Sequence, residues 1–458
     1  MQKMSQVLQI GFQVFCALLV VLAVQALPAS SAERVLLEVA ADTPTIESGK
    51  AATVLVRALV RPPVVTVRER TPLAVAIVLD KSGSMGADRK MENARLGALE
   101  ALERLDARDV ATVIVYDSEA RVLVPPRSAG DKAAFRRAIM GVREGGSTAL
   151  YDGVKLGAEK LRPFVSEGFV PRIVMLSDGQ ANVGPSSTRD LAELGRRLSR
   201  AEVTITTIGL GLDYNEDLMT VLASESGGNS YFAKDADALT SIFARDMDDA
   251  VTLTARKVCL TIEGVSGAMP LRAIGREGER RGNVVSTSID NLYGAEKYAL
   301  FEVEIPGDAD ASILEAAVVR LEYVDPATGE TFTDSLPLRL AQTEDASEVE
   351  RNRNGEIIAQ AALARNAEVR EEVVRLADEG RVQEAARVLK QREADIRALP
   401  APAMSSAAGA AAVAEAEYFE ELANDIAASG SMSSEQRKKN VNDAYVEKNQ
   451  QSKVDKEK

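Results

Sequence analysis

Short apolar runs alternate with amphipathic segments through the middle of this 458-residue chain. The pattern predicts strands that are each followed by a helix, and strands that alternate with helices imply a mostly parallel sheet covered on both faces. We therefore expect a doubly wound α/β domain over residues 73–252. Its expected strands lie at 73–79, 110–116, 122–124, 173–176, 203–210 and near Tyr231, and its helices at 89–105, 131–140, 150–161, 189–200, 217–226 and 236–251.

Two strand-rich stretches flank this region, at residues 34–70 and 257–340. Both are rich in β-branched and alternating apolar positions, which is typical of strands. The first stretch holds too few strands to bury a sheet face by itself. We therefore expect one discontinuous β-sandwich, formed by residues 33–72 and 253–343, with the α/β domain inserted between its strands.

After residue 346 the composition shifts to Ala, Glu, Arg and Leu with helical periodicity. This shift predicts a helical hairpin over residues 346–400, followed by an alanine-rich helix within 401–428. The last stretch, 429–458, is polar, mixed in charge and nearly free of large apolar residues, so we expect a disordered tail there.

Residues 1–32 have the three parts of a secretory signal: a basic start, a short apolar core and a small-residue cleavage site. The apolar core at residues 14–24 is short against the roughly 20 residues that span a bilayer. We expect an exported protein, periplasmic or at the cell surface, with an N-terminal membrane anchor as the alternative. Since no other segment is apolar enough to span a bilayer, the chain is not expected to form a channel.

The composition excludes several classes of function. A net charge of −14 argues against binding a phosphate backbone, and aromatic residues, at 4% with no tryptophan, are too few for base-stacking platforms. Histidine is absent, which removes the usual near-neutral general base and His-ligated zinc. We expect neither nucleic-acid binding nor an enzyme.

Oxygen-bearing side chains follow two of the expected strands. Asp80, Ser82 and Ser84 come directly after the run 73–79, and Asp178 follows the strand at 173–176. Thr148 lies in a glycine-containing loop before a helix. Open α/β sheets hold their ligands at the carboxyl ends of the strands. Oxygen donors without nitrogen or sulfur favour Mg²⁺, Mn²⁺ or Ca²⁺ over zinc or copper.

Three segments carry these side chains in order along the chain: the loop after residue 79, the loop with Thr148 and the end of the strand at 173–176. Together they resemble the von Willebrand factor type A domain and its metal-ion-dependent adhesion site, over about residues 73–252. The resemblance implies that a divalent cation is surrounded by Asp80, Ser82, Ser84, Thr148 and Asp178. It also implies that the acidic side chain, Asp or Glu, of a protein partner completes the coordination. The alternative is a serine-rich turn beside unrelated aspartates. The expected insertion of this domain in a β-sandwich resembles the domain arrangement of integrin β subunits and, more loosely, that of inter-α-trypsin inhibitor heavy chains.

Three functions remain open. The first is cation-dependent protein binding, in adhesion or in assembling an envelope complex. The second is a structural or regulatory envelope protein whose metal only stabilises the fold. The third is a metal-assisted hydrolase, for which the five residues supply no general base beyond the ligands themselves.

The last turns of the helix expected at 236–251 carry three aspartates, Asp246, Asp248 and Asp249. Negative charge at a helix C-terminus opposes the helix dipole, by about 0.3–1 kcal/mol for each exposed charge. We expect either plain acidic surface or a weakened last turn that lets this helix shift against the sandwich.

Overall fold

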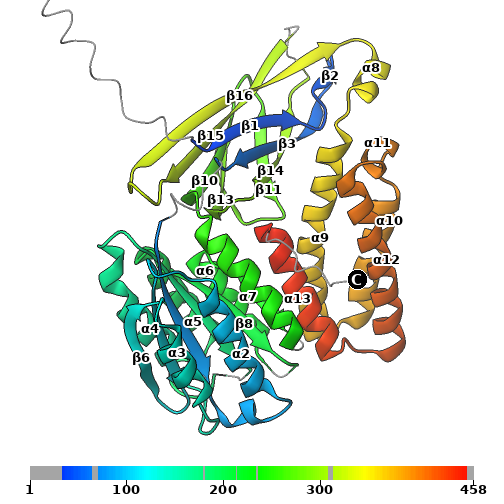
Figure 1. The fold of residues 1–458 in the computed structure, drawn as a ribbon. Coiled ribbons are helices and arrows are strands. Elements are labelled where there is room, and N and C mark those ends of the chain that lie inside the picture. Colours follow the sequence, from blue (N-terminus) through cyan, green and yellow to red (C-terminus); the bar gives the residue numbers. More distant parts are fainter. Residues whose placement is uncertain are drawn as a thin grey trace, which may run out of the picture. The chain divides into compact units, whose positions relative to one another are not determined.

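The computed structural model describes residues 34–63, 71–178, 181–212, 214–233, 236–307 and 313–450. The expected signal segment 1–32 and the end of the expected tail, 451–458, lie outside these residues. The described residues from Leu36 onward form one compact unit with three sheets (Figure 1). In the described part of the chain, no helix is long and apolar enough to cross a membrane.

The α/β domain is built on a six-stranded sheet in the order β6-β5-β4-β7-β8-β9. Neighbouring strands are parallel except for β6, which runs antiparallel to β5 at the edge. The central strand β4 is buried along its whole length, as expected for a strand covered on both faces. The strands are β4 (Leu73–Asp80), β5 (Val110–Tyr116), β6 (Ala120–Ser128), β7 (Val170–Ser177), β8 (Thr204–Leu210) and β9 (Ser230–Ala233).

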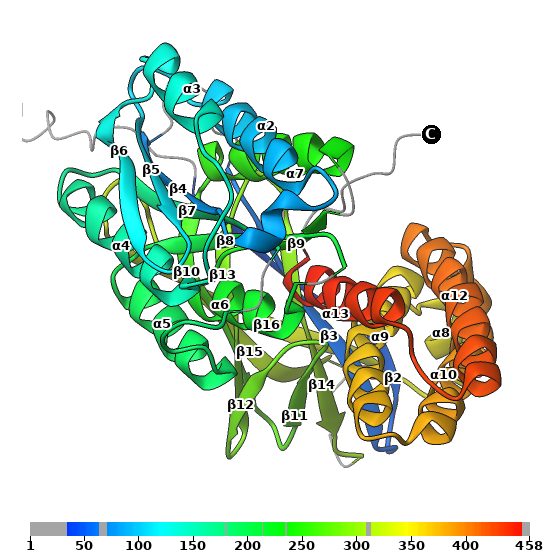
Figure 2. The ribbon, with the colours of Figure 1, turned by 90° about the horizontal axis from the view of Figure 1, so that it is seen from below.

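Helices cover both faces of this sheet (Figure 2). One apolar core lies under α2 (Lys90–Glu103), α3 (Lys132–Met140) and α7 (Ala236–Val251). The other lies under α4 (Leu150–Val165), α5 (Thr188–Arg200) and α6 (Glu216–Ser226). A 3-10 turn, η1 (Gly83–Gly86), follows β4.

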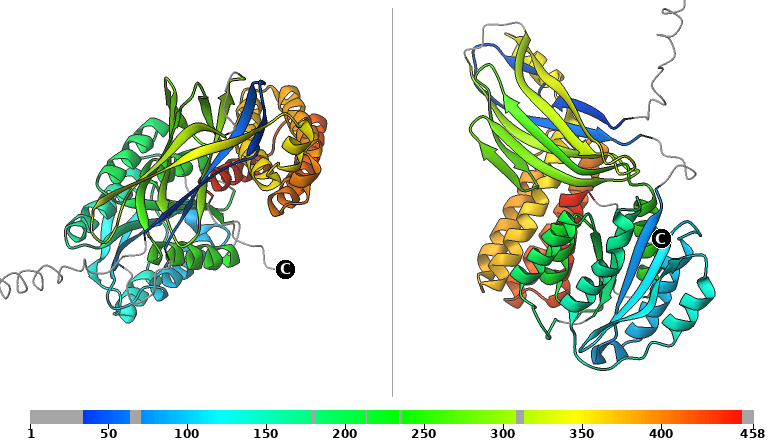
Figure 3. Two further views of the ribbon diagram at one scale, coloured as in Figure 1. Left: turned by 90° about the horizontal axis from the view of Figure 1, so that it is seen from above. Right: turned by 90° about the vertical axis from the view of Figure 1, so that its left-hand side faces the viewer.

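Strands from before and after the α/β domain combine into the two remaining sheets, which pack against each other (Figure 3). One sheet has the order β1-β3-β14-β11, and the other β12-β13-β10-β15-β16-β2. The early strands are β1 (Leu36–Ala41), β2 (Thr45–Glu47) and β3 (Ala52–Arg61). The later ones are β10 (Ala255–Gly264), β11 (Met269–Ile274), β12 (Gly278–Arg281), β13 (Val284–Leu292), β14 (Lys297–Ile305), β15 (Ile313–Val324) and β16 (Thr331–Thr343).

The pairing of β3 with β14 and of β2 with β16 joins the two ends of this sandwich across the inserted domain. The predicted fold class is therefore confirmed: a mostly parallel α/β sheet is inserted in a β-sandwich and followed by helices.

Between the sandwich and residue 450, the structure describes six helices: α8 (Ala346–Arg351), α9 (Gly355–Asp378), α10 (Val382–Arg397), α11 (Ala401–Met404), α12 (Ala407–Ser429) and α13 (Ser434–Asn449). The long helices α9, α10 and α12 share one apolar core, which includes Val373, Leu389 and Phe419. The first part of α9 packs on the sandwich, where Ile357 meets Ile274 and Leu300.

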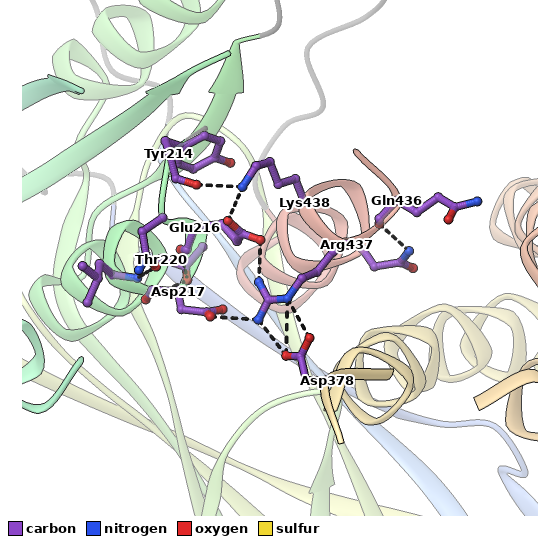
Figure 4. Close-up of polar contacts among 11 residues, drawn as sticks. Tyr214, Glu216, Asp217, Thr220, Asp378, Gln436, Arg437 and Lys438 are labelled. Atoms are coloured by element: carbon purple, nitrogen blue, oxygen red, sulfur yellow. Dashed lines mark hydrogen bonds and ion pairs between the residues drawn. The ribbon is translucent and has the colours of Figure 1, made fainter. Parts of the chain in front are cut away.

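The expectation of a disordered tail from residue 429 is wrong over α13. This helix begins with a capping box between Ser433 and Gln436, a pattern that satisfies two otherwise free backbone donors. Its buried Lys438 donates to the Tyr214 carbonyl at 2.7 Å and to Glu216 Oε2 at 2.5 Å (Figure 4). The composition misled because α13 is held by ion pairs and hydrogen bonds as well as by apolar area.

The expectation for the end of α7 also needs correction, because Asp246 is fully buried. Its Oδ1 accepts hydrogen bonds from Arg172 Nη2 (2.7 Å), Thr206 Oγ1 (2.8 Å) and Asn229 Nδ2 (3.0 Å). Asp246 therefore ties α7 to the sheet. Of the three aspartates, Asp248 is the one that is exposed, as expected for acidic surface.

Candidate metal site at the carboxyl edge of the sheet

Two neighbouring parallel strands bring the predicted carboxylates to the same edge of the sheet. Asp80 is the last residue of β4, and Asp178 directly follows β7. The two strands pair in register from Leu73↔Val170 to Leu79↔Leu176, so their carboxyl ends meet. Both side chains are buried, with exposed fractions of 0% for Asp80 and 1% for Asp178.

A chain of hydrogen bonds links four of the five predicted residues. Asp80 Oδ1 accepts from the Ser82 backbone amide at 2.8 Å. The hydroxyls of Ser82 and Ser84 lie 3.1 Å apart, and Ser84 Oγ donates to Asp178 Oδ1 at 2.9 Å. The structure therefore brings Asp80, Ser82, Ser84 and Asp178 into one polar cluster.

The loop that carries Thr148 lies against this cluster. The Gly83 amide donates to the Gly146 carbonyl at 3.0 Å, and the Gly145 amide donates to the Lys81 carbonyl at 2.7 Å. Gly146 has φ +88°, and a Cβ there would lie 2.9 Å from Asp117 Cβ, so a larger residue would strain the loop. Thr148 is buried beside the loop, with its amide bound to Asn182 Oδ1 at 2.8 Å. Backbone contacts thus hold the loop that carries the fifth predicted residue against the segment that follows β4.

Burial raises the pKa of the Asp80 carboxyl above its ordinary value. The hydrogen bonds from Ser177 and Ser82 oppose this shift, and the nearby charge of Asp178 adds to it. Ser177 Oγ donates to Asp80 Oδ2 at 2.6 Å. Two carboxylates held close together in a low-dielectric site repel each other, and a bound cation would relieve that repulsion.

Lys90, at the start of α2, was not predicted from the sequence as part of this site. Its ammonium is buried and donates to Asp178 Oδ2 at 2.9 Å, so one of the two carboxylates already has a cationic partner. Lys90 also touches the loop after β8, because a Cβ at Gly211 would lie 3.1 Å from Lys90 Cε. A buried lysine needs a charged partner. However, the sequence did not indicate which carboxylate that partner would be.

The donor set matches a hard divalent cation. All five side chains offer oxygen, and Mg²⁺ is typically held by one or two carboxylates with waters in its remaining positions. In the part of the chain that the structure describes, no group of three or more Cys, Asp or Glu is placed to hold a metal ion. A cation at this edge would therefore depend on hydroxyl oxygens and on ligands from outside the chain.

Residues 74–245 match the model of the von Willebrand factor type A domain, so this part of the chain is a domain of that family. Among curated proteins, the uncharacterized protein sll0103 of Synechocystis is 26% identical over 59% of this chain and 66% of its own length. YfbK of Escherichia coli is 25% identical over 54% of this chain and 44% of its own. Human inter-alpha-trypsin inhibitor heavy chain H4 is 29% identical over 34% of this chain and 18% of its own. The chain thus spans less than two thirds of these relatives.

Solved structures show the same fold over nearly the whole chain. The von Willebrand factor type A protein from Catenulispora acidiphila aligns with a TM-score of 0.66 and 16% identity, over 91% of this chain and 98% of that one. The ArnB paralog VWA2 from Sulfolobus acidocaldarius aligns with a TM-score of 0.55 and 18% identity, over 90% and 97%. At these identities the likeness extends to the fold alone.

Proposed function

We propose that this protein is a divalent-cation-dependent protein-binding module, acting in adhesion or in the assembly of a cell-envelope complex. Mg²⁺, or Mn²⁺ or Ca²⁺, would be held by Asp80, Ser82, Ser84, Thr148 and Asp178. An Asp or Glu of the partner would complete the coordination. The type A domain, and relatives such as the inter-alpha-trypsin inhibitor heavy chain, support protein binding as the general role.

The contact between Lys90 and Asp178 is the observation that carries the requirement for a partner carboxylate. Two carboxylates and one ammonium give the site a net charge of about −1. A dication would therefore leave roughly one positive charge uncompensated inside a largely buried site. Uncompensated charge is costly there, and an incoming carboxylate would neutralise it while supplying a hard oxygen ligand.

The alternative is a structural or regulatory envelope protein whose metal only stabilises the fold. Its partner would then bind through the sandwich or the C-terminal helices, and binding would survive removal of the metal. We do not propose an enzyme, because the site offers no general base other than its ligands. We propose export to the periplasm or cell surface on the basis of residues 1–32, with N-terminal anchoring as the alternative.

The test is affinity capture from envelope extracts on the immobilised full chain in Mg²⁺, followed by elution with EDTA. We expect a protein that elutes with EDTA and does not bind the Asp80→Ala variant. The matched control is Asp152→Ala, which changes an exposed aspartate of α4 and should bind as the wild type does. A partner that stays bound in EDTA and binds Asp80→Ala equally would refute the proposal and favour the alternative.

The Thr148 loop separates metal binding from partner binding. We expect Thr148→Ala to weaken partner binding more than Mn²⁺ binding, because two charged ligands, Asp80 and Asp178, remain for the ion. Calorimetric titration with Mn²⁺ and with the purified partner measures both affinities. Partner variants with Asp or Glu replaced by Asn or Gln identify the coordinating residue, and equal affinity for every such variant would rule out a partner carboxylate.

A further inference from the structure

A second candidate site is a cleft of about 850 Å³, whose lining includes none of the five proposed metal ligands. Its walls come from α6 of the type A domain, the sandwich segment around β13, helix α9 and helix α13. This volume is within the range of about 300–1,000 Å³ that small-molecule sites commonly have. The cleft exists because α13 is docked, since α13 supplies one of its walls.

Most charged groups along the cleft are already paired. Arg437 of α13 bridges Asp217 of α6 and Asp378 of α9, at 2.8 Å to each (Figure 4). The other pairs are Arg375 with Glu379 at 2.8 Å, Lys448 with Glu371 at 2.5 Å and Arg196 with Glu225 at 2.9 Å. Because these charges are paired, the sandwich wall is where a charged group of a ligand can find a partner.

On the sandwich wall, Arg276 is a partly buried cation without a carboxylate partner. Its Nη1 makes one long hydrogen bond, 3.4 Å to the Ser288 carbonyl. Its Nη2 is buried and has no hydrogen-bond partner among the described residues. Burial lowers the pKa of Arg276 to about 10, and Asp290 offsets only part of that loss. A guanidinium in this state gains from a carboxylate that can reach it.

Asp290 lines the same wall and also retains hydrogen-bonding capacity. Its Oδ1 accepts from Ser288 Oγ at 2.7 Å, and no ion pair within 4.0 Å joins it to Arg276 in the described residues. Asp290 and Arg276 are close enough to interact electrostatically without touching. A cation and an anion separated in this way match a ligand that carries an ammonium and a carboxylate on the same carbon atom.

Between their paired charges, the opposite walls also carry apolar side chains. Val221 of α6, Val374 of α9, and Val441 and Ala444 of α13 all line the cleft. These side chains favour an uncharged aliphatic body on the ligand, and each methylene buried there should tighten binding about fourfold.

We propose that this cleft binds an α-amino acid with an aliphatic side chain. The ligand carboxylate would contact Arg276, its ammonium would contact Asp290, and its side chain would pack against the three valines. This site is independent of the proposed metal site and of the proposed partner binding.

The test is calorimetric titration of the full chain in EDTA, so that the metal site does not contribute. The probes are leucine, 4-methylvalerate, which lacks the ammonium, isoamylamine, which lacks the carboxylate, and inorganic phosphate. We expect leucine to bind about tenfold or more tightly than either analogue, since a hydrogen bond to a charged group contributes that much. Phosphate should bind least, because Asp290 repels a second negative charge.

Two variants assign the contacts. Arg276→Gln should no longer prefer leucine to isoamylamine, because it cannot bind the carboxylate that distinguishes the two. Asp290→Asn should no longer prefer leucine to 4-methylvalerate, because its side chain has no charge to pair with the ammonium. Asp290 has φ +63°, a conformation that Asn also tolerates, so Asp290→Asn tests the site even if Arg276→Gln fails to fold. The matched control is Arg280→Gln, an exposed position in β12, which should bind leucine unchanged. No leucine binding, tightest binding of phosphate, or unchanged binding by both variants would overturn the proposal.

Discussion

Replacing Asp246 by alanine should destabilise this protein strongly, because the change would leave Arg172 as a buried charge without its partner. The Arg172 side chain is 2% exposed and that of Asp246 is 0% exposed. Burial by itself would lower the pKa of Arg172, and the Asp246 carboxylate raises it above its ordinary value. The guanidinium also lies over the Tyr293 ring at 5.6 Å, so it connects the type A domain with the sandwich.

The expected cost is about 3–5 kcal/mol of unfolding free energy, the usual loss when one partner of a buried ion pair is removed. Thr206 and Asn229 also lose their shared acceptor, which places the cost toward the upper end. The double variant Arg172→Met/Asp246→Leu should recover most of the loss, because an apolar pair of similar volume carries no desolvation penalty.

Urea unfolding followed by circular dichroism measures both free energies. The matched control is Asp248→Ala, two residues further along α7, where the side chain is 66% exposed and lies 3.6 Å from Arg104. It should change stability by less than about 1 kcal/mol. If Asp246→Ala costs no more than Asp248→Ala, the buried pair does not anchor α7, and a last turn that shifts becomes the better account of this helix.

Three other contacts can be tested by measurements of stability or amide exchange. Saturating Mg²⁺ should raise thermal stability, by about 2.7 kcal/mol at a hundredfold excess over Kd. The gain should vanish in Asp80→Ala and also at acid pH, where the Asp80 carboxyl takes up a proton. An equal gain in the wild type and in Asp80→Ala would contradict the proposed metal site. Burial and the neighbouring Asp246 raise the pKa of Asp249 to about 6, so its ionisation destabilises the fold as pH rises from 4 through 6. Asp249→Asn should therefore melt higher than the wild type at pH 7.5, and the difference should shrink toward pH 4; a gain independent of pH would exclude titration as its cause. Lys438→Met should speed amide exchange throughout α13, because the free energy that protects its amides should fall by about 1.5–3 kcal/mol. The matched control is Lys439→Met, at the exposed neighbouring position, which should leave exchange unchanged. Equal effects of the two variants would show that α13 does not depend on the Lys438 contacts.

The alternation of strands and helices in the α/β domain could be read from the sequence because each element carries its own periodicity. The positions of Asp80 and Asp178 could be read for the same reason, since a residue that ends a parallel strand must lie at the carboxyl edge of the sheet. A discontinuous sandwich was inferred because too few strands precede the α/β domain to cover a sheet face. The structure then showed which strands join its two parts, such as β3 with β14. These features depend on short segments of the chain.

The remaining features depend on contacts between residues far apart in sequence, and only the tertiary structure decided them. Composition indicated disorder for α13, yet Lys438 meets Glu216, which lies 222 residues earlier. Charge pattern indicated a weak end for α7, yet Asp246 meets Arg172 from β7, 74 residues earlier. A polar residue stabilises or destabilises according to whether a partner reaches it, and the sequence gives the residue type without the partner. For the same reason the sequence indicated the oxygen-bearing side chains at the carboxyl edge of the sheet but did not reveal that Lys90 pairs with Asp178 there.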